Sequence, residues 1–552
     1  MLSTMQDVPL TVTRILNHGT TVHGSAQVIT WTGDGAPQRR SFREIGARAA
    51  QLAHALREDL GVAEDERVAT FMWNNAEHVE AYFAIPCMGA VLHTLNLRLP
   101  ADQLVWIVGH AADRVILVNG SLLGLLAPLL DRMPTVEHVV VSGPGDRSLL
   151  DGVRAQVHEY EDLIADRPTG YDWPELDERR AAAMCYTSGT TGDPKGVVYS
   201  HRSIYLHSMQ VNMAQSMGLT DADISLVVVP QFHVNAWGLP HATFMTGVGM
   251  LMPDRFLQPA PLAEMIEAER PTHAAAVPTI WQGLLAELNA KPRDVSSLGH
   301  VTIGGAACPP SLMEAFDRHG VRVCHAWGMT ETSPLGTVAH PPAHAVGTDE
   351  EFAYRLTQGR FPAGVEARLV GPGGAHLPWD GESAGELEVR GPWIAGAYYG
   401  GAAGDVLKPE DKFSADGWLK TGDVGVISAD GFLTLTDRAK DVIKSGGEWI
   451  SSVELENALM SHPDVAEAAV VAVPDEKWGE RPLATVVLKE DATADYTALR
   501  DFLATRVAKW QLPERWTRVA SVPKTSVGKF DKKVLRRQYA EGELDVTDVT
   551  RG

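Results

Sequence analysis

Cysteine is scarce in this sequence, which speaks against a zinc site and favours a reducing compartment. The 552-residue chain holds only 4 cysteines, and no two of them have CxxC spacing; they are Cys87, Cys185, Cys308 and Cys324. Cysteines this far apart speak against a zinc site and suit a reducing cytosol. We therefore expect a cytoplasmic protein without structural zinc.

Long apolar runs and an excess of positive charge are also missing. No stretch reaches the ~18 consecutive apolar residues of a membrane-spanning helix, and the start, MLSTMQDVPLTVTRIL, lacks the basic and apolar segments of a signal peptide. The chain has 48 Lys and Arg against 70 Asp and Glu, a formal net charge of −22. This acidity argues against general affinity for nucleic acid or anionic lipid, so an anionic substrate needs a local basic site.

Length and hydrophobic patterning indicate a globular α/β protein with several domains or subdomains. Hydrophobic residues make up 45% and charged residues 21% of the chain, an ordinary globular balance. Short β-branched runs alternate with longer helical patterns, which predicts largely parallel sheets. The strand candidates are residues 67–73, 114–119, 224–230 and 300–305.

The pattern changes after residue 385, where Gly and Asp become frequent between short alternating strands. These features predict a small β subdomain made of hairpins. Further along, Ser451 and Glu454 have the spacing of a capping box ahead of a helix and a strand. The last part of the chain is therefore expected to form a small α+β domain, joined to the rest near residues 437–441.

The stretch CYTSGTTGDPKGVVYSH, residues 185–201, has the composition of a phosphate-binding loop. Its glycines let the backbone turn sharply and direct N–H groups at an anion, while its hydroxyl residues add donors and Lys195 adds a positive charge. It is not a Walker A loop, where Lys follows Gly directly, and no GxGxxG fingerprint supports hydride chemistry. Taken alone, such a composition is more often an ordinary surface loop, so the whole string must carry the interpretation.

That string, YTSGTTGDPKGV, closely resembles the phosphate loop of the AMP-forming adenylating enzymes: acyl-CoA synthetases, luciferases and peptide-synthetase adenylation domains. The resemblance continues in order over almost the full chain, with WGMTETSP at 327–334, TGD at 421–423, DRAKDVIKSGGEWIS at 437–451 and PKTSVGKFDKK at 523–533. It implies an AMP-binding and acyl-binding domain at 1–437, a hinge at 438–440 and a mobile C-terminal domain at 441–552. In this family a carboxylic acid is joined to AMP with release of pyrophosphate, and the acyl group then passes to a thiol.

The resemblance also implies roles for individual residues in adenylation. Lys529 matches the lysine that bridges the carboxylate and the α-phosphate, Thr330 matches a contact to the α-phosphate, and Glu331 matches the ligand of Mg²⁺. Either Trp327 or the tyrosine commoner at its position could stack on adenine, and Asp423 matches the acid that binds the ribose. The nucleotide-binding residues implied are Thr187, Ser188, Gly189, Thr190, Thr191, Lys195, Gly305, Ala306, Trp327, Gly328, Asp423 and Arg438.

The segment VVVPQFHVNAWGLP, residues 227–240, resembles the acyl-pocket segment of fatty acyl-CoA synthetases. There His233, which we count among the catalytic residues, and Trp237 match an aromatic gate to the acyl tunnel. Thr279 and Gly304 are the other expected substrate-binding residues, and the surrounding THAAAVPTIW is small and apolar. Since neither segment contains an acidic residue to meet an amino group, activation of an amino acid is disfavoured.

Because the closest likeness is to bacterial medium- and long-chain fatty acid–CoA ligases, we expect a fatty acid as substrate, with ATP, Mg²⁺ and coenzyme A as cofactors. Gly446 and Gly447 are expected to let the pantetheine arm of CoA approach the backbone. Small molecules are thus the expected partners, nucleic acid is not, and a homodimer is left open. The alternatives are a short-chain or methylmercaptopropionate–CoA ligase, a luciferase-like oxidase, and a non-catalytic acyl- or nucleotide-binding protein. Retention of Lys195, Glu331, Asp423 and Lys529 argues against the last.

Overall fold

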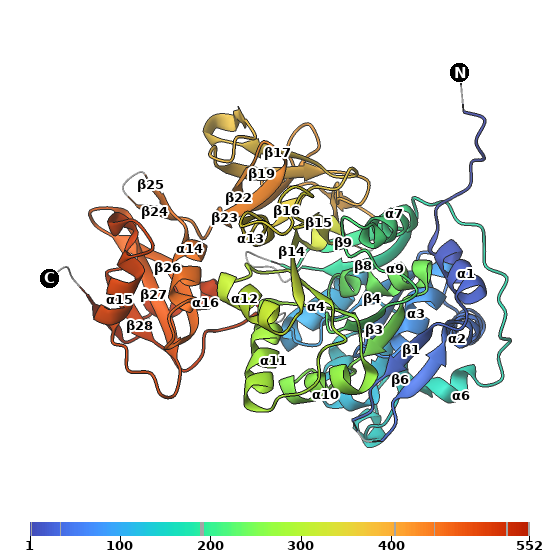
Figure 1. Cartoon of the computed structure of the whole chain (residues 1–552). Helices are drawn as coiled ribbons and strands as arrows, with labels where there is room; N and C mark the ends of the chain where they lie inside the picture. The colour runs from blue at the N-terminus through green and yellow to red at the C-terminus, as the bar shows by residue number, and fades with distance from the viewer. Residues whose placement is uncertain are drawn as a thin grey trace.

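The computed structural model describes residues 1, 3–33, 35–187, 193–401, 404–445, 448–525 and 528–549. It is an α/β structure in which a large N-terminal part, built on two sheets, adjoins a smaller C-terminal part built on a third (Figure 1). The α/β class expected from the sequence is thereby confirmed. No helix in the described ranges is long and apolar enough to cross a membrane.

The first sheet of the large part is parallel at its centre and antiparallel at one edge. Strands β3 to β8 pair in parallel, and β9, β20 and β21 extend the sheet antiparallel. From edge to edge the described strands are β21 (Val406–Leu407), β20 (Tyr398–Tyr399), β9 (Gly196–Ser200), β8 (Ala181–Tyr186), β4 (Val91–Thr94), β3 (Arg67–Phe71), β5 (Val115–Asn119), β6 (His138–Ser142) and β7 (Gln156–Glu159).

The second sheet joins a parallel half to an antiparallel half along one hydrogen-bonded path. The expected hairpin subdomain starts earlier than residue 385, at β17, and is continuous with the parallel strands rather than separate from them. The strands in order are β18 (His376–Leu377), β17 (Glu366–Val370), β19 (Gly385–Arg390), β22 (Leu419–Ile427), β23 (Phe432–Arg438), β16 (Gly359–Arg360), β15 (Leu335–Val338), β14 (Arg322–Gly328), β13 (His300–Ile303), β12 (His273–Ala276), β10 (Ile224–Val227), β11 (Gly249–Met252), β1 (Gln27–Thr30) and β2 (Gln38–Ser41).

Helices cover these sheets, and α3, which is buried at every residue except Glu77, packs against α1 and α2. Its residues belong to a core that extends through both sheets of the large part. The helices of this part are α1 (Val12–Val22), α2 (Phe42–His54), α3 (Ala76–Cys87), α4 (Ala101–Ala111), α5 (Leu123–Leu126), α6 (Tyr160–Ile164), α7 (His201–Asn212), α8 (Val234–Trp237), α9 (Leu239–Thr246), α10 (Pro259–Glu269), α11 (Pro278–Ala290), α12 (Pro310–Arg318) and α13 (Glu351–Leu356).

The C-terminal part is a small α+β unit, as expected. Its strands are β24 (Ile443–Ser445), β25 (Glu448–Ile450), β26 (Val465–Asp475), β27 (Gly479–Leu488), β28 (Arg515–Arg518) and β29 (Val546–Asp548), and its helices are α14 (Ser452–Met460), α15 (Tyr496–Ala504) and α16 (Lys532–Ala540). The side chain of Ser451 accepts a hydrogen bond of 3.1 Å from the backbone N–H of Glu454 and so caps α14. This bond confirms the predicted helix start.

The four strand candidates of the parallel sheets are confirmed as β3, β5, β10 and β13, with shorter ends. β10 ends at Val227, although the N–H of Val229 still donates to the carbonyl of Ala275 in β12 at 3.2 Å. The side chain of Asn74 donates hydrogen bonds of 2.7 and 2.8 Å to the carbonyls of Val227 and Val229 and so fixes the segment that leads to His233.

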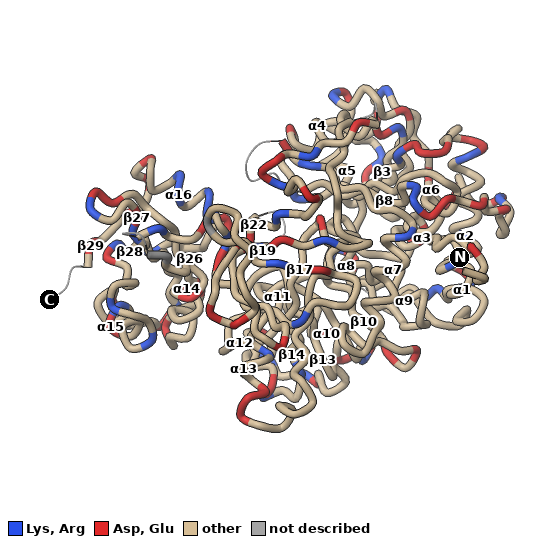
Figure 2. Tube along the Cα trace, turned by 90° about the horizontal axis from the view of Figure 1, so that it is seen from above, with Lys and Arg blue, Asp and Glu red and all other residues tan. Residues whose placement is uncertain are grey.

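Residues 437–441 lie where the two parts meet. β23 ends at Arg438, a turn follows, and β24 begins at Ile443, so the expected hinge falls at this strand end. Helix α14 contacts β23 and, with α16, faces the large part (Figure 1). Lys and Arg as well as Asp and Glu occur in both parts (Figure 2), so neither part carries charges of one sign alone.

Candidate active site

A cavity of about 550 Å³ lies where the C-terminal part meets the carboxyl ends of parallel strands in the second sheet. Such strand ends are the usual ligand sites of α/β proteins. Every predicted site residue that the structure describes lines this cavity; they are Thr187, Lys195, His233, Trp237, Thr279, Gly304, Gly305, Ala306, Trp327, Gly328, Thr330, Glu331, Asp423, Arg438 and Lys529. Ser188, Gly189, Thr190, Thr191, Gly446 and Gly447 lie outside the described residues.

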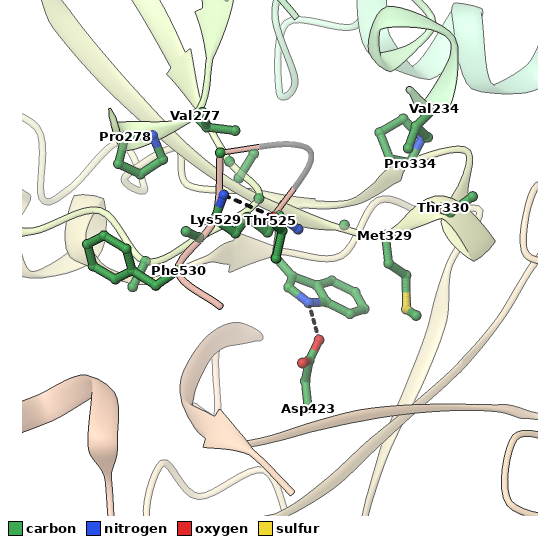
Figure 3. A pocket seen from close by; sticks show the side chains of 18 of the residues that line it. Val234, Val277, Pro278, Met329, Thr330, Pro334, Asp423, Thr525, Lys529 and Phe530 are labelled. Atoms are coloured by element: carbon green, nitrogen blue, oxygen red, sulfur yellow. Dashed lines mark hydrogen bonds between the residues drawn. The ribbon is translucent and has the colours of Figure 1, made fainter. Parts of the chain in front are cut away.

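Lys529 enters the cavity on a loop of the C-terminal part (Figure 3). Its Cε lies against Gly305, which has φ +82°, and a Cβ added there would sit 3.2 Å from this atom. A side chain at that position would therefore crowd the lysine. Burial, together with the charge of Arg438, lowers the pKa of Lys529 to about 8, while Asp423 and Glu331 oppose that shift.

Asp423 is held by two donors from other parts of the cavity wall. The indole N–H of Trp327 donates to its Oδ2 at 2.7 Å, and Arg438 pairs with its Oδ1 at 3.0 Å. Figure 3 shows the bond to Asp423 as a dashed line. Each carboxylate oxygen keeps a second lone pair for another donor. The sequence placed all three residues in one site but did not predict that they contact each other.

Glu331 and Thr330 are fixed by two tyrosines that the sequence did not single out. Tyr398 donates to Glu331 Oε1 at 2.7 Å, and Tyr199 donates to the carbonyl of Thr330 at 2.8 Å. Burial and the Glu331 carboxylate raise the pKa of Tyr398, so its hydroxyl stays a donor. The sequence signal for Tyr398 is the stretch GAYYG, which its composition places in the β subdomain; the structure instead places Tyr398–Tyr399 in β20 of the first sheet.

The two ends of the phosphate loop meet at the base of the loop. The N–H of Thr187 donates to the carbonyl of Lys195 at 3.0 Å, and the Thr187 hydroxyl accepts from the N–H of Lys195 at 3.3 Å. The ammonium of Lys195 lies 5.1 Å from the centre of the Tyr398 ring, a cation–π distance. Lys195 and Glu331 are therefore both neighbours of Tyr398.

His233 and Trp237 lie at another wall of the cavity, among small and apolar side chains. Burial, with the charges of Lys529 and Arg98, lowers the pKa of His233 to about 3, so its imidazole is neutral at physiological pH. The Trp237 ring covers Gly304, where an added Cβ would lie 3.2 Å from its Cη2. Val234 and Pro334 line one end of the cavity, opposite Val277 and Pro278 (Figure 3).

Comparison with known proteins agrees with this geometry. The pattern of the AMP-binding enzyme family matches residues 18–399, and that of the AMP-binding enzyme C-terminal domain matches residues 454–529. The chain therefore belongs to the AMP-binding enzyme family.

Several relatives match it almost end to end. It is 43% identical to the 3-methylmercaptopropionyl-CoA ligase of Ruegeria pomeroyi, over 98% of this chain and 99% of that protein. It is 41% identical to the medium-chain-fatty-acid–CoA ligase of Ectopseudomonas oleovorans, over 98% of both, and 40% identical to the long-chain-fatty-acid–CoA ligase of Thermus thermophilus, over 97% of both. The crystal structure of the anthranilate CoA ligase AuaEII with anthranoyl-AMP, 26% identical, superposes with a TM-score of 0.85 over 98% of this chain and 100% of that one.

Proposed function

We propose that a medium- or long-chain fatty acid is the substrate of this AMP-forming acid–CoA ligase. The relatives named above are all CoA ligases, and AMP-forming enzymes of this class use ATP and CoA. The observation that carries the proposal is that one cavity has two kinds of wall. Charged residues suited to a nucleotide, among them Lys529 and Asp423, lie next to an apolar wall around Trp237.

In the first half-reaction a carboxylate oxygen of the fatty acid forms a bond to the α-phosphorus of ATP, and the bond from that phosphorus to pyrophosphate breaks. Two anions must approach each other, so positive charge in a water-poor site lowers the barrier. Lys529 supplies an ammonium at the junction of the nucleotide and acyl walls. Thr330 is proposed to donate to the α-phosphate, and Lys195 to hold the outer phosphates.

Asp423 and Trp327 are proposed to bind the nucleoside. The Asp423 carboxylate, held by Trp327 and Arg438, keeps lone pairs for the ribose hydroxyls. Because Trp327 already donates its indole N–H, its ring orientation is fixed before the nucleotide arrives. That fixed ring offers adenine a stacking surface.

Mg²⁺ fits the chemistry of Glu331, whose carboxylate is a hard oxygen ligand. Within the described ranges no group of three or more His, Cys, Asp and Glu side chains could hold a metal. A single carboxylate that shares the ion with substrate phosphates is, however, a common arrangement for Mg²⁺. Bound there, the ion would neutralise phosphate charge, and Tyr398 would orient the carboxylate that holds it.

In the second half-reaction the thiol of CoA attacks the acyl carbon of the adenylate and AMP leaves. We propose that the C-terminal domain turns about residues 438–440 between the two steps, which withdraws Lys529 and brings Gly446 and Gly447 to the site. We further propose a cytoplasmic location, which suits the four free cysteines, all of them buried. A homodimer remains a prediction that light scattering of the purified enzyme would test.

The experiment is a coupled pyrophosphate assay across straight-chain acids from acetate to palmitate, with methylmercaptopropionate included. The proposal expects kcat/KM to rise with chain length into the medium range. A profile that peaks at acetate or propionate, or that favours methylmercaptopropionate over octanoate, would support the second candidate, a short-chain or methylmercaptopropionate–CoA ligase. The specific observation behind that candidate is the 43% identity to the Ruegeria pomeroyi enzyme.

A further inference from the structure

The segment after His233 has a backbone that its residue types disfavour. Five successive residues have positive φ: Val234 at 47°, Asn235 at 50°, Ala236 at 49°, Trp237 at 56° and Gly238 at 75°. Only glycine adopts this region freely, asparagine tolerates it, and for a β-branched residue such as Val234 it is a clear outlier. The short helix α8 is thus a left-handed turn, and its surroundings must impose that conformation.

Asn235 is the one residue of this turn whose side chain bonds to other parts of the protein. Its Oδ1 accepts from the thiol of Cys185 at 3.2 Å. The hydroxyl oxygen of Tyr82 lies 3.4 Å from the same Oδ1, while its single O–H donates to the carbonyl of Gln231, just ahead of the turn. Asn235 and Cys185 are both buried, so the bond between them forms away from water, where a hydrogen bond is electrostatically stronger.

The turn decides where Trp237 lies. Its ring contacts the cavity wall at Gly304. On the other side, the ring of His207 packs so closely on Gly238 that a Cβ there would lie 2.7 Å from the imidazole. The turn is therefore held at Asn235 and at Gly238, and Trp237 projects into the cavity from between these two points.

We propose that Asn235 is a specificity-determining positioning residue for the acyl group. Its side chain ties the left-handed turn to β8 through Cys185 and so holds the Trp237 ring over Gly304, where the ring limits the acyl wall. The inference rests on the proposed function, since it assumes that this wall receives the acyl chain. Substituting a residue needed only for folding would lower kcat/KM for all acids alike. Substituting Asn235 should instead change the ratio of kcat/KM between long and short acids.

The test compares the wild-type enzyme with Asn235→Gly and Asn235→Ala by pyrophosphate release with octanoate and with propionate. Glycine relieves the backbone and removes the acceptor, whereas alanine removes the acceptor without relief. We expect the octanoate-to-propionate ratio of kcat/KM to move toward one by about tenfold in both variants. Ala112→Gly, which relieves another left-handed residue with φ 54° away from the cavity, should leave the ratio unchanged.

An octanoate-to-propionate ratio that is unchanged in both variants would overturn the inference. A ratio that changes in the alanine variant alone would also overturn it, because backbone geometry rather than the Asn235 side chain would then set the preference. If either variant fails to fold, as judged by its thermal unfolding, Cys185→Ala removes the thiol that donates to Asn235. A ratio that moves toward one in that variant supports the inference, and an unmoved ratio contradicts it. Failure of the wild-type enzyme to release pyrophosphate with any acid would instead refute the proposed function.

Discussion

The two sides of the cavity are built differently. On the large domain, the nucleotide wall is cross-braced by short side-chain bonds: Trp327 to Asp423, Tyr398 to Glu331 and Tyr199 to Thr330. The loop that carries Lys529 meets this domain with a much weaker contact, a 3.4 Å bond from Thr279 to the carbonyl of Gly528. A braced wall is pre-organised for one ligand geometry, whereas a loosely held loop can leave without breaking the wall.

The largest expected effect tests whether the loop serves one half-reaction only. Lys529→Ala should slow acyl-adenylate formation by ~10²–10³, the usual loss when an electrostatic contact to a transition state is removed. Thioester formation from a supplied acyl adenylate should remain largely intact. Pyrophosphate release and acyl-CoA formation, measured separately, give the two rates. Lys524→Ala removes a nearby lysine that pairs with Glu467 outside the cavity, and it should change neither rate. Equal loss of both half-reactions in the Lys529 variant would contradict the assignment.

The next effect tests whether the loop moves about residues 438–440. Lys440 lies in the turn after β23, and proline there would restrict both its own φ and the residue before it. Lys440→Pro should therefore slow thioesterification by up to ~10²-fold, as misplaced groups do, while sparing adenylation more. Single-turnover rates of the two steps provide the measurement. Lys440→Ala keeps the backbone free and is the matched control. If the proline variant slows neither step, the hinge interpretation is wrong.

A pH profile sharpens the comparison, because the loop of the C-terminal part contributes Lys529, whose pKa lies closer to neutrality than that of an ordinary lysine. The pKa of Lys529 is lowered to about 8, so its ammonium predominates below that pH and is lost as pH rises through it. The kcat/KM for pyrophosphate release should accordingly fall by about tenfold per pH unit above the pKa. Lys529→Arg keeps its charge at these pH values and should be slower but without this fall. A wild-type rate that stays flat to pH 10 would refute the need for the ammonium.

The sequence predicted which residues lie at the site, but it did not predict the bonds that hold them in place. The ordered motifs placed every described site residue on one cavity, and β-branched runs placed β3, β5, β10 and β13. The bonds that brace the wall were not predictable, because they join residues such as Glu331 and Tyr398 whose contact depends on how two sheets pack. The left-handed turn after His233 could not be predicted from the sequence for a related reason. Its local preferences oppose it, and contacts from distant segments help to sustain it, among them the bond from Cys185 to Asn235 and the packing of His207 on Gly238.

The smallest effect concerns the apolar wall, where the braced domain meets the acyl chain. Burying one methylene contributes ~0.8 kcal/mol, so each added carbon should raise kcat/KM by roughly three- to fourfold until the tunnel ends. Trp237→Ala should blunt that gradient, because the ring over Gly304 would no longer shape the wall. The measurement is a kcat/KM series over even-numbered acids for both proteins, with thermal unfolding recorded alongside. If Trp237 were only a packing residue, the variant would lose stability while its chain-length profile matched that of the wild type. A changed profile with a nearly unchanged unfolding midpoint is therefore the result that would separate gating from packing.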